Sequence, residues 1–231
     1  MDASFAALLA GKLLEGLKAT LLLLLICGVL GNLLAIPLAF ARISNNRLLR
    51  APAYGFILVM RGTPVLVQLY IIYYGLGEVF SQMPAVRESM FWPYLRSGFW
   101  YAALALTLNT SAYCGEILRG AITNVAAGQI EAAKSLGMRP MPTMFLVVVP
   151  QAIRAALPSL AGQNILLLKA TSLASTITIF EVMAAANQVR SETFRVYESL
   201  FGAALVYIVL TLVMTTGFSM IEKRLNRPYV R

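Results

Sequence analysis

The chain has 231 residues, of which 59% are apolar and only 13% are charged, and it carries a net charge of +9 and no histidine. Soluble domains contain roughly 45–50% apolar and about 25% charged residues, so this composition excludes an ordinary soluble protein. The lack of histidine excludes histidine-ligated metal sites and histidine general bases. We attribute the positive charge to cytoplasmic loops of a membrane protein rather than to nucleic-acid binding.

Uncharged runs predict the membrane spans, because a helix needs about 20 mostly apolar residues to cross the hydrocarbon core. Residues 19–41 and 199–221 carry no charge over 23 residues each, and residues 97–115 carry none over 19. Two further apolar stretches contain one intramembrane charge each, Arg61 and Lys169. The sequence therefore predicts an all-α polytopic membrane protein with five transmembrane helices in one domain. Their expected ranges are about 19–41, 52–76, 99–119, 155–178 and 198–221.

The segment before the first span, residues 1–18, is expected to form a short amphipathic lead at the outer surface. The first apolar run is too long for a signal-peptide core, so we interpret it as a retained span. A turn is expected at residues 44–46, where Ser, Asn and Asn follow one another.

The second span contains Arg61, Gly62, Thr63 and Pro64 within an apolar helix. Pro64 removes a backbone hydrogen bond, so the helix should kink there. An intramembrane arginine is costly and usually faces a cavity or a partner, which makes Arg61 a candidate for a translocation path. Alternatively, Arg61 lies near the inner end of the span and extends to the interface. Thr63 and Gln68 are expected on the same path.

The third span places Asn109, Tyr113 and Glu116 at positions i, i+4 and i+7, so these side chains should share one helix face. A polar face inside a membrane helix points to a pore, a ligand or another helix. The alternative to a path is a set of hydrogen bonds between helices, which applies to Asn109 above all.

The fourth span places Lys169, Ser172 and Thr176 on a shared face. Lys169 is expected to pair with Glu116 as a buried ion pair, or each is expected to meet a charged solute. All three residues are candidates for the translocation path.

The loop expected at residues 120–150 contains a capped, two-turn helix at residues 129–136, bracketed by Gly128 and Gly137. Glu131 is expected in the first turn and Lys134 in the second, as the helix dipole favours. Small residues leave room for a partner to approach closely. The residues expected to contact that partner are Gly128, Glu131, Ala132, Ala133 and Gly137. The alternative is an ordinary loop between spans.

The distribution of Lys and Arg predicts the orientation. The loop after span one, the loop after span three and the tail at residues 222–231 together hold ten, whereas the opposite segments hold six. By the positive-inside rule, the first group lies in the cytoplasm. The N-terminus is therefore expected outside, and the C-terminus and the 120–150 loop inside.

Several of these segments resemble the signatures of permease subunits of polar amino-acid ABC importers, and the resemblance covers nearly the whole chain. The matching segments are residues 61–64 with Val67 and Gln68, residues 109–120 (NTSAYCGEILRG), residues 128–137 (the EAA loop), Leu157 with Pro158, and residues 169–173 (KATSL). The SNNRLLR stretch and the long outer loop are more similar to the M-type partner of histidine/lysine/arginine and opine importers. Where that family commonly has proline, this chain has Ala126, which should leave the loop slightly less rigid.

The resemblance implies the type I ABC importer permease fold and a role in importing a polar, basic amino acid or an opine across the bacterial inner membrane. It implies a pore formed with a second permease subunit, either Q-like or a second copy of this chain. It also implies an ATP-binding subunit dimer that docks on the Glu131 helix, a periplasmic solute-binding protein, and contact with membrane lipid. ATP would be hydrolysed by the partner subunit, and this chain would bind no cofactor, no metal and no nucleic acid.

No enzyme motif competes with this interpretation, because the sequence contains no GxxxxGK[ST], HExxH or GxSxG pattern and no catalytic residues are assigned. Within the same class, the solute could be glutamine or another polar amino acid. An ion-coupled secondary transporter is a different class, but its inverted repeats are not evident and it leaves the 120–150 loop unexplained. A purely structural membrane subunit is disfavoured by the intramembrane charges.

Overall fold

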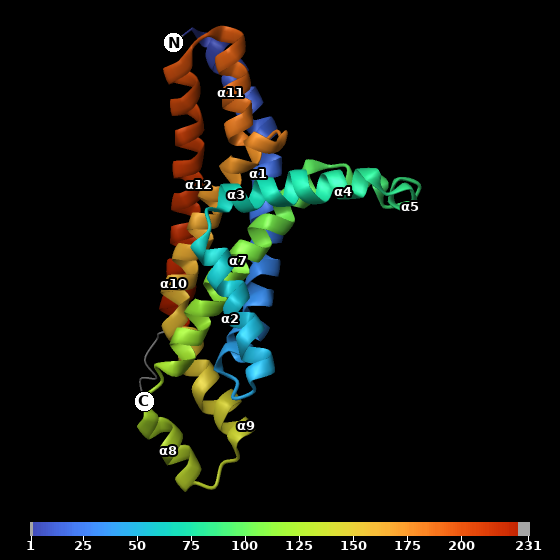
Figure 1. Cartoon of the computed structure of the whole chain (residues 1–231). Helices are drawn as coiled ribbons and strands as arrows, with labels where there is room; N and C mark the ends of the chain where they lie inside the picture. The colour runs from blue at the N-terminus through green and yellow to red at the C-terminus, as the bar shows by residue number, and fades with distance from the viewer. Residues whose placement is uncertain (1, 226–231) are drawn as a thin grey trace.

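The structure, a computed structural model, describes residues 2–225, and these residues form helices and connecting turns without strands (Figure 1). The predicted tail at 222–231 lies outside the described residues from residue 226 onward. The α-helices are α1 (Ala3–Ile43), α2 (Arg47–Gly62), α3 (Val65–Tyr70), α4 (Gly77–Gln82), α5 (Pro84–Arg87), α6 (Trp92–Leu95), α7 (Gly98–Thr123), α8 (Ala127–Ser135), α9 (Pro140–Pro142), α10 (Val149–Ala170), α11 (Val182–Thr193) and α12 (Val196–Leu225). Within residues 2–225, the other helices are two π-helices, η1 (Ile71–Leu76) and η2 (Thr143–Val148), and one 3₁₀-helix, η3 (Thr171–Ile177).

Helix α1 is continuous over 41 residues, so the expected lead at residues 1–18 and the first span belong to one helix. Every third or fourth side chain of α1 is buried, from Phe5 near its start to Ala39 near its end. Such spacing places the buried residues on one stripe of an α-helix. The first part of this stripe, Phe5, Leu9 and Leu13, packs against α11 and α12.

Helix α7 lies at the centre of the molecule, packed on α1, α2 and α10 (Figure 1). Small residues let α1 and α7 approach closely: a Cβ on Gly31 would lie 2.8 Å from the Thr110 side chain. The core between them includes Leu23, Cys27 and Leu106, all nearly inaccessible to solvent. Close packing through small residues is the usual basis of helix association in membranes, because lipid is as apolar as the side chains.

Gly16 of α1 allows an equally close contact with the start of α11, and we expect Gly16→Ala to destabilise the protein. A Cβ there would lie 2.6 Å from the backbone carbonyl of Glu181, and the backbone cannot yield as a side chain can. Overpacking of this kind costs about 1–3 kcal/mol. Gly11→Ala is the matched control, because a Cβ on Gly11 meets nothing within 4 Å. The midpoint of thermal unfolding in detergent should fall for Gly16→Ala only, and equal midpoints for the two variants would contradict this contact.

The predicted kink in span two is confirmed, and it is larger than a simple proline kink. The axes of α2 and the following α3–η1–α4 segment differ by 107°. Thr63 and Pro64 both have extended backbone angles, so α2 ends at Gly62 and a new helix begins at Val65. The α3–η1–α4 segment projects sideways from the bundle and ends at α5 (Figure 1). We call residues 65–97 the outer arm.

Within residues 2–225, three helical stretches are long and apolar enough to span a membrane: Ala3–Ile43, Pro140–Ile177 and Val196–Leu225. The bent pair of α2 and α3–α4 becomes a fourth if it is counted as one span. Helix α7 coincides with the predicted third span but is not among them, because its polar residues make it less apolar than the other three. Five spans therefore stay a prediction. The fourth span was expected to start near residue 155, whereas its helix begins at Pro140.

The two ends of the bundle are different in character. The start of α1 and the turn between α11 and α12 lie at one end, and α8 lies at the other (Figure 1). At the first end, an ion pair of 2.5 Å between Arg195 and Asp2 links the α11–α12 turn to the start of α1. At the other end of α11, inside the bundle, Glu181 is a fully buried N-cap, and it accepts hydrogen bonds from the backbone N–H groups of Met183 and Ala184 and from the Tyr207 hydroxyl.

Candidate functional site

The helix α8 forms the expected capped unit at the free end of the bundle. Gly137 has a φ of +75°, a conformation that glycine adopts without steric cost. The Met138 N–H donates to the Ala133 carbonyl at 3.0 Å, and the Gly137 N–H donates to the Lys134 carbonyl at 2.9 Å. These two bonds form a Schellman motif, which satisfies carbonyl groups at the end of the helix. The role expected for Gly137 as a C-terminal cap is thus confirmed.

The start of α8 differs from the expectation. The helix begins at Ala127, so Gly128 lies inside it rather than before it, and Glu131 lies in the second turn rather than the first. Ala126 takes the N-cap position with φ −56° and ψ 129°. Because proline fixes φ near −65°, this backbone angle is the one that proline would impose. The alanine at this position therefore leaves the backbone geometry unchanged.

Ala132 and Ala133 of α8 face in different directions. Ala132 and Glu131 are exposed, but Ala133 is only 4% exposed, because α8 packs against η2 within the same chain. Ala133 therefore does not belong to a surface open to a partner, contrary to the expectation. A cavity of about 450 Å³ lies under this helix and is lined by Ile130, Lys134 and residues of η2.

At the break between α2 and α3, the side chains of Gln68 and Asn109 hold the end of α2 against the start of α3. The Gln68 amide donates to the Met60 carbonyl at 2.8 Å and to the Thr63 hydroxyl at 2.7 Å. The Asn109 amide donates to the Gln68 side-chain oxygen at 3.0 Å and to the Met60 carbonyl at 3.3 Å. A helix break leaves the last carbonyl groups without partners, and these amides supply them. Asn109 thus makes the hydrogen bonds between helices that the sequence left as an alternative.

We expect Gln68→Leu to loosen this break. The leucine would leave a carbonyl of the break without its main donor, at a cost of about 1–3 kcal/mol. Hydrogen–deuterium exchange in residues 60–68 should therefore accelerate by roughly 5–150-fold, if opening governs exchange. Gln82→Leu is the control, because Gln82 is exposed on the same outer arm and its side chain bonds only to Glu78 at 3.3 Å. If exchange in residues 60–68 of Gln68→Leu equals that of the wild type, the Gln68 side chain does not stabilise the break.

Apart from Gln68, the predicted path residues of spans two and three border two cavities that share Tyr113. One cavity, of about 310 Å³, is lined by Arg61, Glu116 and Arg42 among others. The other, of about 250 Å³, is lined by Thr63, Asn109 and residues of α10. The Arg61 guanidinium lies 5.3 Å from the centroid of the Tyr113 ring, within the range of a cation–π contact. Arg61 is exposed on the surface of the chain.

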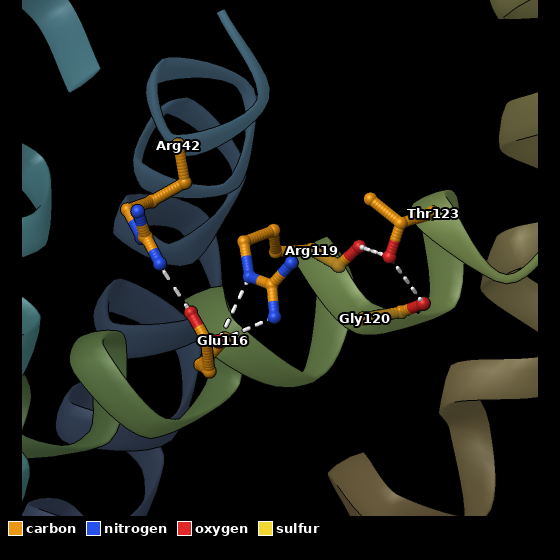
Figure 2. Close-up of polar contacts among 5 residues, drawn as sticks. All are labelled: Arg42, Glu116, Arg119, Gly120 and Thr123. Atoms are coloured by element: carbon orange, nitrogen blue, oxygen red, sulfur yellow. Dashed lines mark hydrogen bonds and ion pairs between the residues drawn. The ribbon is translucent and has the colours of Figure 1, made fainter.

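Glu116 lies between two arginines, as Figure 2 shows. Arg119, one turn further along α7, reaches Glu116 Oε1 at 2.6 Å. Arg42, at the end of α1, places Nε 3.6 Å from Glu116 Oε2, an ion-pair distance that exceeds a hydrogen bond. Thr123 donates to the carbonyl of Arg119 or Gly120, each at 3.1 Å, in the last turn of α7.

The expected pair of Glu116 with Lys169 is not formed among residues 2–225. Glu116 is already paired with Arg42 and Arg119, and Lys169 is exposed at the end of α10. The shared face expected for Lys169, Ser172 and Thr176 is also altered, because residues 171–177 form a 3₁₀-helix. With three residues per turn, Ser172 lies in line with Ser175, and Thr176 is turned away by about 120°.

The sequence interpretation did not include Arg42 and Arg119 in the site. The pairing of Arg119 with Glu116 was predictable from the sequence, since the two residues are three positions apart on one helix, a spacing typical of side-chain pairs. The pairing of Arg42 with Glu116 was not predictable, because it depends on the packing of α1 on α7. Among residues 2–225, no group of three or more His, Cys, Asp or Glu side chains could hold a metal ion.

Known proteins match this chain along almost its entire length. The octopine transport system permease protein of Rhizobium radiobacter is 46% identical over 210 residues, which cover 91% of this chain and 84% of that protein. The histidine/lysine/arginine/ornithine transport system permease protein of Salmonella typhimurium is 36% identical over 214 residues, covering 93% and 90%. A crystal structure of an amino acid ABC transporter with histidines is 34% identical and superposes with a TM-score of 0.83, covering 97% of this chain and 100% of that one.

The fold is therefore the type I ABC importer permease fold that the sequence resembles. Residues 31–227 also match the family described as binding-protein-dependent transport system inner membrane component. A match over most of the chain, together with relatives of more than 30% identity, establishes membership. The chain belongs to the family of inner membrane components of binding-protein-dependent transport systems.

Proposed function

We propose that this chain is the permease subunit of an ATP-driven ABC importer that carries a basic amino acid or an opine across the bacterial inner membrane. The observation that carries the proposal is α8, a capped helix that exposes Glu131 at the free end of an apolar bundle. The solute class is supported by the relatives, whose names specify octopine and histidine, lysine, arginine and ornithine.

The partners follow from this role. An ATP-binding subunit dimer docks on α8 and hydrolyses ATP, because the sequence of this chain has no phosphate-binding loop. A second permease subunit, Q-like or a second copy, closes the translocation path along the face that exposes Arg61, Thr63 and Lys169. A periplasmic solute-binding protein delivers the solute at the opposite end, and alternating access moves it inward.

The orientation places the N-terminus in the periplasm and the C-terminus in the cytoplasm. The start of α1 and α8 lie at opposite ends of the bundle, so a cytoplasmic α8 requires an outer N-terminus (Figure 1). The excess of Lys and Arg in the segments on the α8 side supports the same orientation. Alkaline phosphatase fused after residue 231 should be inactive, and a fusion near residue 85 should be active. The reverse pattern would refute this orientation.

The function is tested by measuring uptake of labelled arginine, lysine, histidine, octopine and glutamine in cells with and without this gene. Uptake of a basic amino acid or octopine should require the gene and ATP. Gene-dependent uptake of glutamine alone would favour the alternative of a same-class permease for another polar amino acid. Uptake that survives ATP depletion but stops when the ion gradient is collapsed would instead indicate a secondary transporter.

A further inference from the structure

A pocket at the base of the outer arm combines aromatic rings with one charge of each sign. It has a volume of about 430 Å³ and lies between α4, α6 and the start of α7. We call it the outer-arm pocket. Its lining includes Tyr73, Tyr74, Tyr101, Trp92, Glu78 and Arg96. None of these residues belongs to the α8 surface or to the predicted translocation path.

The rings are arranged as adjoining walls rather than as a stack. Tyr73 and Tyr101 meet edge to face at 5.9 Å and 81°, and Tyr73 and Tyr74 meet at 4.9 Å and 71°. Tyr101 is only 6% exposed and fixes the floor, whereas Tyr74 is 58% exposed at the rim. Gly77 leaves the floor open, since even a Cβ there would lie 3.9 Å from the Tyr101 ring. Perpendicular aromatic walls are suited to an organic cation, which ring faces attract.

Among the residues that the structure describes, the two charges at the pocket are not neutralised by a partner of opposite charge, and Glu78 accepts one long hydrogen bond, from the Gln82 amide at 3.3 Å. Glu78 and Arg96 are both exposed, and neither takes part in an ion pair within residues 2–225. A carboxylate recognises an ammonium group, and a guanidinium recognises a carboxylate through two parallel hydrogen bonds. One ligand class carries both groups on one carbon atom, namely α-amino acids.

We propose that the outer-arm pocket binds a free α-amino acid with a cationic or neutral polar side chain, before the solute enters the translocation path. Glu78 and the rings hold the ammonium group, and Arg96 holds the carboxylate. This proposal rests on the proposed import function and on the orientation that places the outer arm on the periplasmic side. It gives the importer a second, weaker solute site between the binding protein and the membrane path.

The test uses the complete transporter, reconstituted in liposomes with its partner permease, ATP-binding subunits and binding protein, and arginine as the probe. Glu78→Gln and Arg96→Gln should each raise the apparent KM for arginine by about tenfold or more, the effect of losing one charge-assisted contact, without lowering the maximal rate. Glu88→Gln and Arg87→Gln are matched controls, because these charges lie on the same outer arm away from the pocket. The controls should keep the wild-type KM.

Tyr74 gives an independent check, because its ring stands exposed at the rim of the pocket. Tyr74→Leu should raise the KM and Tyr74→Phe should not, since the ring face is what attracts the cation. Pocket variants that behave like the controls, or that lower only the maximal rate, would overturn the proposed site. Failure of the wild-type transporter to import any basic amino acid would instead overturn the proposed function.

Discussion

Replacing Gly137 with aspartate is expected to uncouple transport while leaving membrane insertion intact. Gly137 holds a φ of +75°, and its N–H and that of Met138 close the end of α8. A residue with a Cβ in this conformation costs about 1–2 kcal/mol. A cost of this size shifts the equilibrium between the capped and the uncapped end of α8 by roughly 5–30-fold toward the uncapped form. Because α8 is the proposed contact with the ATP-binding subunit, solute uptake should fall, by at most this factor. Glu131→Lys, which reverses the exposed charge on the same helix, should have the same kind of effect.

Gly128→Ala is the matched control for Gly137→Asp. Gly128 lies inside α8, has no positive φ, and a Cβ there meets nothing within 4 Å. Alanine should stabilise the helix slightly, so uptake should be unchanged. The measurements are uptake, ATP hydrolysis by the reconstituted complex and copurification of the ATP-binding subunit. Gly137→Asp with wild-type copurification and wild-type uptake would show that the cap does not matter for coupling.

Removing the charge of Glu116 should lower the free energy of unfolding more than Gly16→Ala or Gln68→Leu does. In Glu116→Gln, Arg42 would lose its ion-pair partner although its side chain is only 15% exposed. Breaking a buried pair costs about 3–5 kcal/mol, and partial exposure places this one at the lower end. The double variant Glu116→Gln with Arg42→Gln should recover part of that loss, because no uncompensated charge stays buried. Arg119 is 30% exposed and can turn to water.

The measurement for Glu116 is a double-mutant cycle on thermal stability in detergent, with uptake assayed on each variant. Lys169→Gln is the control, because Lys169 is exposed and forms no ion pair within residues 2–225. Its effect should add to that of Glu116→Gln without coupling. Coupling between Glu116 and Lys169, or a Glu116→Gln protein as stable as wild type, would contradict the structure of this cluster. Normal assembly with altered uptake in the double variant would place Glu116 on the translocation path.

Features that depend on neighbouring residues could be predicted from the sequence. The kink after Gly62 follows from Pro64, which has no N–H to donate, and the end of α8 follows from Gly137, which alone adopts a positive φ freely there. The long apolar runs of α1 and α12 follow from the composition of the segments themselves. The motifs at residues 61–64, 109–120, 128–137 and 169–173 are also specific enough to indicate the family.

Features that depend on helices packing together were decided only by the tertiary structure. Glu116 pairs with Arg42 rather than Lys169 because the end of α1 packs on α7, two segments that are far apart in the sequence. Ala133 is buried because α8 folds back onto η2, and residues 171–177 tighten into a 3₁₀-helix where α10 meets α11. Helical periodicity tells which side chains share a face, but it does not tell what that face meets. Which helix faces pack against each other is decided by the packing free energy summed over distant parts of the chain.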